Sequence, residues 1–189
     1  YFDSCALGAG QFCTKPGLVV LLDQPLAREL VSVTSDLFRS GTPGVLLSER
    51  GPGEIKQAID RYMVNGAELV TGGKQGTASY FCHANTLLSV SGRKFLENPD
   101  VFQTEAFGTV GLFVLAEDLG ELGTIAASLE GSLTGTFYTH TAGEDDAIYE
   151  EIAPIVRTKV GRLLNDKMPT GVAVVPSMNH GGPFPATGH

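Results

Sequence analysis

Gly10-Gln11-Phe12-Cys13-Thr14-Lys15-Pro16-Gly17 is the stretch from which the fold and the chemistry are best approached, because it sets a cysteine in a turn with a glycine at each end. Glycine adopts backbone conformations that other residues resist, and such a turn lets the backbone N–H of the cysteine donate to a developing oxyanion. The apolar run Leu18–Leu22 follows directly and is typical of a strand buried on both faces of a parallel sheet. This setting suits a nucleophile.

Outward from this stretch, the spacing of apolar residues alternates between the helical and the strand period. The predicted helices cover residues 25–40, 52–65, 117–129 and 142–156, and the predicted strands cover 18–22, 67–70, 84–90, 108–115, 133–138, 160–164 and 171–175. In the second helix, Ile55, Ile59, Tyr62 and Met63 are expected on the inner face. The alternation predicts an α/β layer fold with a largely parallel sheet.

Composition narrows the class of protein. With 189 residues, of which 42% are hydrophobic, the chain is long enough to bury a sizeable core, and one domain is expected. A net charge of −8 disfavours a surface for nucleic acid or for an anionic membrane, because either needs clustered Lys and Arg. No apolar run reaches membrane-spanning length, so a soluble, cytoplasmic protein is expected.

The three cysteines, Cys5, Cys13 and Cys82, are odd in number and lack the spacing of a zinc site, so we expect neither a disulfide framework nor a metal. Cys5 and Cys82 are interpreted as packing residues. A cysteine beside a strand is more often a buried inert thiol than a nucleophile, and the residues alone leave both readings of Cys13 open. Lys15 is a candidate to assist ionisation of the Cys13 thiol.

The eight-residue motif around Cys13 resembles the catalytic-cysteine signature of the aldehyde dehydrogenase superfamily. Its GQFCTxPG form is similar to the branch that contains α-ketoglutarate semialdehyde (2,5-dioxopentanoate) dehydrogenases and some NADP-preferring fatty-aldehyde dehydrogenases. The resemblance implies that Cys13 is the nucleophile, with Phe12 and Thr14 beside the substrate. A thiolate adds to an aldehyde, and the thiohemiacetal that forms gives up a hydride to a nicotinamide ring and leaves a thioester for water to cleave.

A second segment, Asn98–Gly108, is similar to the EE[IV]FGP box of this superfamily. The resemblance implies that Glu105 hydrogen-bonds the nicotinamide ribose, since a carboxylate accepts hydrogen bonds from both hydroxyls of a diol, and that Phe107 packs near the nicotinamide. The chain departs from the box at Thr104 and Thr109, where glutamate and proline usually stand. Without the resemblance, Glu105 would be interpreted as a solvent-exposed carboxylate just before a strand.

A third set of matches lies near the C-terminal end. The residues Gly161-Arg162, Pro169-Thr170-Gly171-Val172 and His180–Thr187 look like the GR…PTGV…HGGPxPAT pattern of the semialdehyde branch. The resemblance places this loop beside the substrate tunnel, so Phe184 is expected to line the tunnel and His180 to brace it. A glycine- and proline-rich loop with a capping histidine is an equally good reading. With the stretch 85–96 added, the resemblance spans nearly the whole chain.

As a whole, the resemblance implies a three-layer, aldehyde dehydrogenase-like catalytic domain over residues 1–189, taken from a longer homo-oligomeric enzyme that uses NADP or NAD and a small aldehyde, expected to be 2,5-dioxopentanoate. No glycine-rich phosphate-binding fingerprint opens a helix here, so the cofactor-binding domain is expected elsewhere in the polypeptide, with the general base and the oxyanion asparagine. Alone, the domain is expected to turn over little or nothing.

Three alternatives remain open. A fatty-aldehyde dehydrogenase shares much of the same pattern. A non-catalytic domain that keeps the fold is a second alternative, against which the presence of Cys13 and Glu105 argues. A cysteine hydrolase is the third, but His83, His140, His180 and His189 lie in segments without a recognisable hydrolase signature.

Overall fold

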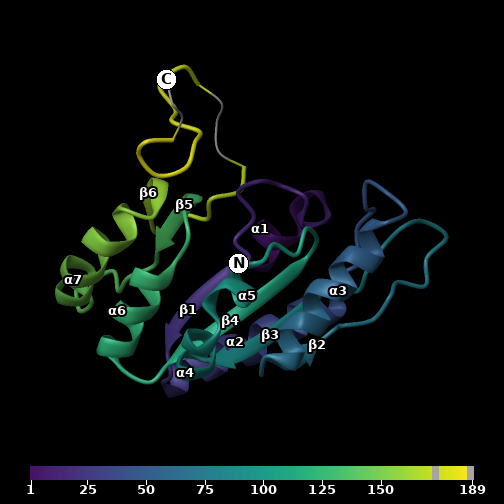
Figure 1. Cartoon of the computed structure of the whole chain (residues 1–189), viewed down its shortest axis with the longest axis horizontal. Coiled ribbons are helices and arrows are strands. Elements are labelled where there is room, and N and C mark those ends of the chain that lie inside the picture. Colours follow the sequence, from purple (N-terminus) through teal and green to yellow (C-terminus); the bar gives the residue numbers. More distant parts are fainter. Residues whose placement is uncertain (172–174, 187–189) are drawn as a thin grey trace.

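The computed structural model describes residues 1–171 and 175–186, which form two β-sheets with helices packed around them (Figure 1). The strands are β1 (Leu18–Leu22), β2 (Glu68–Thr71), β3 (Thr86–Ser91), β4 (Val110–Ala116), β5 (Ser132–Phe137) and β6 (Val160–Asn165). The helices are α1 (Phe2–Ala6), the 3₁₀ turn η1 (Leu7–Gly10), α2 (Pro25–Ser40), α3 (Gly51–Val64), α4 (Gly92–Glu97), α5 (Pro99–Gln103), α6 (Leu119–Ser128) and α7 (Asp146–Arg157).

The larger sheet has the strand order β1-β4-β3-β2, in which β1, β4 and β3 run parallel and β2 is antiparallel to β3. In the register of the sheet, Leu18 of β1 lies opposite Leu112 of β4. The expectation of a largely parallel α/β sheet is confirmed. One detail differs: β1, the edge strand, packs against cores on both faces of the sheet, but its five residues are half-buried rather than buried.

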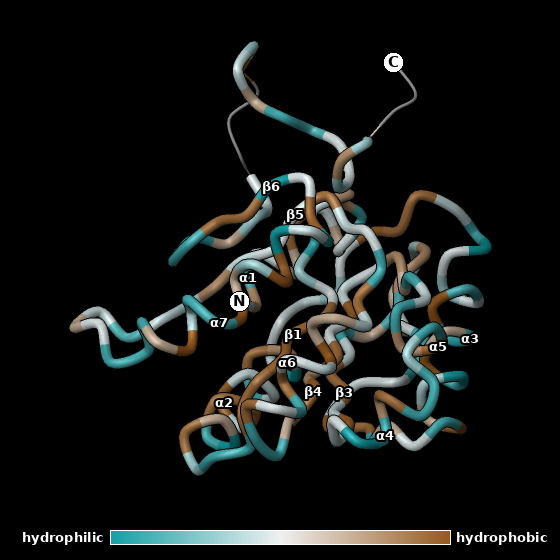
Figure 2. Tube along the Cα trace, turned by 60° about the vertical axis from the view of Figure 1, so that its left-hand side comes forward, coloured by the Kyte–Doolittle hydropathy of each residue, from teal (hydrophilic) through white to brown (hydrophobic). Residues whose placement is uncertain are grey.

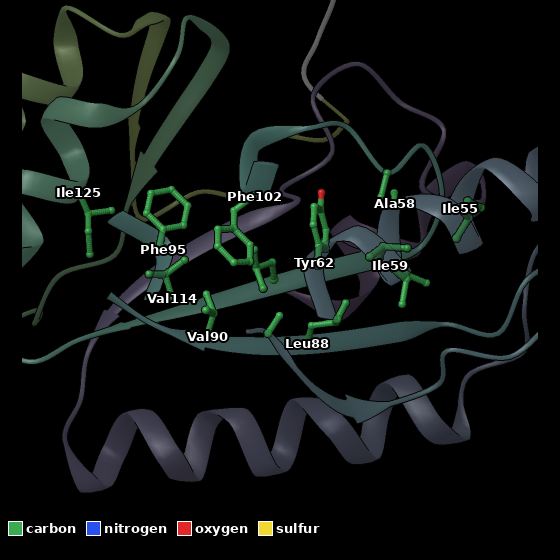
Figure 3. Close-up of a cluster of buried hydrophobic side chains, with 14 of the residues drawn as sticks. Ile55, Ala58, Ile59, Tyr62, Leu88, Val90, Phe95, Phe102, Val114 and Ile125 are labelled. Carbon is green, nitrogen blue, oxygen red and sulfur yellow. The ribbon is translucent and has the colours of Figure 1, made fainter. Parts of the chain in front are cut away.

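Alternate residues of the strands face two separate cores, one on each side of the larger sheet. On one side, Leu88, Val90 and Val114 pack against the apolar faces of α3, α4 and α5, as Figure 3 shows. On the other side, Leu87 and Phe113 pack with Cys5 of α1 and Phe38 of α2. Helices therefore cover both faces of the sheet, and the expected three-layer architecture is what the structure has.

Strands β5 and β6 form a second, parallel two-stranded sheet, and α7, which connects them, packs back onto both strands (Figure 1). This pair lies beside the larger sheet, on the side of β1, and the segment after β6 returns across its upper end in the view of Figure 1. The strand predicted over residues 171–175 includes residues outside the described ranges.

Apolar spacing located the four longer helices α2, α3, α6 and α7, but it did not always identify the buried face. On α3, Ile55, Ile59 and Tyr62 are buried as expected, whereas Met63 is exposed, and Ala58 takes its place in the core. Figure 2 shows hydrophobic residues along β1, β3 and β4, and also on α2. The apolar residues whose spacing predicted α2 are mostly exposed on that helix, namely Leu26, Leu30, Val33 and Leu37.

No helix among the described residues combines the length and the apolar composition needed to cross a membrane.

Candidate active site

Cys13 lies in the turn between η1 and β1, and its side chain is exposed, whereas Cys5 and Cys82 are buried. The chain enters this turn through a left-handed stretch, with φ angles of 58° at Gly8, 59° at Ala9 and 71° at Gly10. The turn is closed by a hydrogen bond of 3.0 Å from the Lys15 N–H to the carbonyl of Phe12. Cys13 is thus the accessible thiol of the three, as the sequence predicted.

The imidazole of His180 lies against this thiol, with its Nε2 3.5 Å from the Cys13 Sγ. The segment that carries His180 is held to β6, because the Asn179 side chain donates to the carbonyl of Gly161 at 3.0 Å and a Cβ on Gly161 would collide with the Gly181 backbone. Between β6 and His180, the Thr170 hydroxyl donates to the Thr14 carbonyl at 3.1 Å. These contacts return the loop to the cysteine turn.

Sequence reasoning gave His180 a bracing role and missed its contact with the thiol. A separation of 167 residues hides such a pair from any pattern of local spacing. The HGGP stretch itself was the signal that marked this loop as part of the site.

Lys15 does not point at the thiol. Its ammonium donates to the carbonyls of Ala106 at 2.8 Å and of Val110 at 3.1 Å, in the segment between α5 and β4. Burial lowers the pKa of the Lys15 ammonium, an effect that the nearby Cys5 and Glu105 partly offset. No contact of the Lys15 side chain supports the expectation that it assists ionisation of Cys13. The side chain instead links the Cys13 turn to the segment between α5 and β4.

Glu105 and Phe107 lie on the loop between α5 and β4, and both side chains are exposed. The Tyr62 hydroxyl of α3 donates to the carbonyl of Thr104 and so holds the start of this loop. Gly10 packs so closely on the backbone of Gly108 that no Cβ fits between them. The Glu105–Phe107 segment and the Cys13 turn are therefore side by side, although about a hundred residues separate them in the chain.

The three residues expected at the substrate differ in their surroundings. Phe12 is 44% exposed and its ring lies over Gly8, next to the thiol in sequence. Thr14 is buried. Phe184 is 98% exposed and borders a surface hollow together with Val160 and Leu163.

Cys82 and His83 are adjacent in the sequence, and both are buried. The His83 Nδ1 lies 2.9 Å from the carbonyl of Ala84. Burial lowers the pKa of His83. Both residues fit the structural role predicted for them. Within residues 1–171 and 175–186, His, Cys, Asp and Glu side chains nowhere gather in a group of three that could hold a metal ion.

No family model matches the chain. Two curated proteins are similar to it over almost its whole length: α-ketoglutaric semialdehyde dehydrogenase 2 of Azospirillum brasilense, 34% identical over 99% of this chain and 35% of the relative, and α-ketoglutaric semialdehyde dehydrogenase of Acinetobacter baylyi, 30% identical over 96% of this chain and 34% of the relative. The chain spans about a third of the length of these curated relatives.

Solved structures share the fold. Lactaldehyde dehydrogenase from Escherichia coli superimposes with a TM-score of 0.74 at 19% identity, over 96% of this chain and 39% of that one. An NAD⁺ complex of aldehyde dehydrogenase from Bacillus cereus has a TM-score of 0.74 at 16% identity, over 96% of this chain and 36% of that one. The chain is therefore similar in sequence to a segment of α-ketoglutaric semialdehyde dehydrogenases, and it shares the fold of the corresponding segment of aldehyde dehydrogenases.

Proposed function

We propose that the chain is the cysteine-bearing catalytic domain of a longer enzyme, one that oxidises an aldehyde to a carboxylate with NAD or NADP as its cofactor. The observation that carries this proposal is the exposed Cys13 thiol with the His180 imidazole 3.5 Å away. A thiol is a weak nucleophile until it loses its proton, and an imidazole in contact with it can accept that proton.

In this mechanism the Sγ proton of Cys13 passes to Nε2 of His180, and the thiolate forms a bond to the aldehyde carbon. The carbonyl π-bond breaks as this bond forms, and the backbone N–H of Cys13 donates to the oxyanion that develops. The product is a thiohemiacetal on Cys13. Water later cleaves the thioester formed from it, releasing the carboxylic acid and the thiol.

The residues next to the thiol fit a nicotinamide cofactor. Glu105 offers an exposed carboxylate that can accept hydrogen bonds from both hydroxyls of a ribose, and Phe107 offers a ring that is 41% exposed. The close packing of Gly10 on Gly108 keeps both residues beside the cysteine turn. When bound, a nicotinamide cofactor would supply the hydride acceptor that the thiohemiacetal needs. Glu105 and Phe107 bind and orient it.

The names of the two curated relatives favour 2,5-dioxopentanoate as the substrate, and Phe12, Thr14 and Phe184 are the residues that we place around it. A fatty aldehyde is the second candidate, because the exposed rings of Phe12 and Phe184 suit an apolar chain. The proposal includes a homo-oligomer, as the resemblance implies, and the cytoplasmic location that we expect from the sequence. The general base and the oxyanion asparagine are then supplied by the rest of the polypeptide.

The test follows NAD(P)H formation by the complete polypeptide, with 2,5-dioxopentanoate and a long-chain aldehyde supplied separately. Replacing Cys13→Ala is expected to abolish turnover, because no other group supplies the thioester. The matched control is Cys82→Ala, which removes a buried thiol and is expected to keep activity. Equal turnover by Cys13→Ala and the unchanged protein would rule out the proposed nucleophile, and the preferred aldehyde decides between the two substrates.

A further inference from the structure

Lys15 is a partly buried cation whose role the proposed reaction leaves unassigned. Its backbone N–H closes the turn that carries Cys13, through the 3.0 Å hydrogen bond to the Phe12 carbonyl. Its side chain leaves this turn and reaches the carbonyls of Ala106 and Val110, at 2.8 and 3.1 Å. One residue therefore shapes the cysteine turn with its backbone and contacts the loop of Glu105 and Phe107 with its side chain.

The two carbonyls bracket the part of that loop on which the cofactor contacts depend. Ala106 stands between Glu105 and Phe107, and Val110 is the first residue of β4. Gly10 packs on Gly108, midway between the two carbonyls, so the cysteine loop touches residues 106, 108 and 110 in turn. These contacts fix both the distance and the rotation of the loop relative to the thiol.

A charged donor suits this position better than a neutral one. Ala106 and Val110 are buried at 6% and 2% exposure. The Ala106 carbonyl also accepts from the Gly108 N–H at 2.9 Å, so loss of the ammonium would be most costly at the Val110 carbonyl. The Val110 carbonyl also faces the Cys5 thiol, at 3.7 Å, which is a weak donor and a poor substitute for an ammonium. An ammonium has three N–H groups, enough to serve both carbonyls at once.

We propose that Lys15 is a positioning residue, which holds the Glu105–Phe107 segment in register with the Cys13 thiol so that the cofactor and the nucleophile meet at the same carbon. This inference rests on the proposed function for its catalytic consequence, but its structural part does not. Lys15 touches neither substrate nor cofactor. Its effect is exerted through the loop that it holds.

The structural part is tested by hydrogen exchange in the complete polypeptide. The reporters are the Gly108 and Val110 amides, which donate to the Ala106 and Gly108 carbonyls at 2.9 and 2.7 Å. In Lys15→Met these amides are expected to exchange about tenfold faster, as the loss of a charged hydrogen bond predicts. Lys56→Met removes an exposed lysine on α3 and is the matched control, with no change expected. If Lys15→Met does not fold, Lys15→Gln keeps two N–H donors and is expected to show a smaller increase.

The catalytic part is tested by the kinetics of the same variants. Lys15→Met is expected to raise the KM for the cofactor about tenfold while changing the KM for the aldehyde less than about twofold. In Lys15→Ala, n-propylammonium is expected to restore the cofactor KM by occupying the vacated site, whereas n-propanol is not. A purely structural role would raise neither KM selectively and would not respond to the cation.

The outcomes are separable. Unchanged exchange at Gly108 and Val110 in Lys15→Met would overturn the proposal, whatever the activity. Faster exchange with an unchanged cofactor KM would overturn the positioning role. If the unchanged protein oxidises no aldehyde, the proposed function fails, and the exchange experiment still decides whether Lys15 holds the loop.

Discussion

The contact between Cys13 and His180 places an imidazole base at the thiol, whereas the sulfur of the buried Cys5 faces the carbonyl of Val110. Only the thiolate reacts with an alkylating agent or an aldehyde. Replacing His180→Ala is therefore expected to slow alkylation of Cys13 by iodoacetamide at neutral pH by about tenfold, a modest value for the loss of a positioned base. The measurement is the rate of Cys13 modification, followed by mass spectrometry of the tryptic peptide.

The control for this prediction is His140→Ala, which removes an exposed imidazole in the connection between β5 and α7. Its alkylation rate should equal that of the unchanged protein. The deficit of His180→Ala should also shrink in alkaline solution, where hydroxide removes the thiol proton without help. A His180→Ala rate that matches the control at neutral pH would mean that the imidazole does not assist the thiol.

Among the elements, the turn from η1 into β1 depends most on a single glycine. Gly10 has a φ of 71°, and a Cβ there would collide with the carbonyl group of Gly108. Gly10→Ala is expected to lower the free energy of unfolding by about 2 kcal/mol or more, because it adds both backbone strain and a clash with backbone atoms that cannot move aside. Denaturant unfolding of the complete polypeptide measures the change.

Gly53 in the first turns of α3 provides the matched substitution, since a Cβ there meets nothing within 4 Å. Gly53→Ala is expected to leave stability unchanged or to raise it by about 0.5–1 kcal/mol, because alanine loses less backbone entropy than glycine in a helix. If Gly10→Ala unfolds at the same denaturant concentration as Gly53→Ala, the tight packing of the two loops is not needed for stability.

The strands and the long helices were predictable from the sequence, and the short helices α4 and α5 were not. The strand over residues 18–22 and the helix from Pro25 to Ser40 have the bounds that apolar spacing predicted. Helices α4 and α5 were not predicted, since each is too short for a helical period to show. They form because Phe95 and Phe102 stack in the core at 5.7 Å, and because the Ser91 side chain caps α4. Both causes depend on tertiary contacts or on a single residue.

Over the whole molecule, the motifs identified residues, and folding decided how these residues relate to one another. Local spacing and the resemblance marked Cys13, Glu105 and Phe107, and the structure places their loops in contact through Gly10 and Gly108. Sequence reasoning left the direction of the Lys15 side chain undecided, and it did not predict that His180 returns to the thiol. Both depend on pairings between residues that are far apart in the chain.

The chain spans about a third of its curated relatives, and this limits what the 189 residues do alone. In the proposed function, the hydrogen bonds that Glu105 contributes as a charged group are worth about 1.5–3 kcal/mol. Micromolar binding needs about 8 kcal/mol, so Glu105 and the Phe107 ring do not hold a dinucleotide by themselves. We therefore expect the isolated chain to form no detectable NAD(P)H with either aldehyde, and to bind NAD⁺ or NADP⁺ only weakly in a calorimetric titration.

The isolated chain is nevertheless expected to have a reactive thiol at Cys13, because the contacts that shape this turn and bring His180 to it lie within the described residues. Iodoacetamide should modify Cys13 faster than the buried Cys5 and Cys82, which provide internal controls in the same digest. Thiol reactivity without turnover would separate the two roles, with the nucleophile built by this domain and the cofactor held by the rest of the polypeptide. Sustained NAD(P)H formation by the isolated chain would contradict that division of labour.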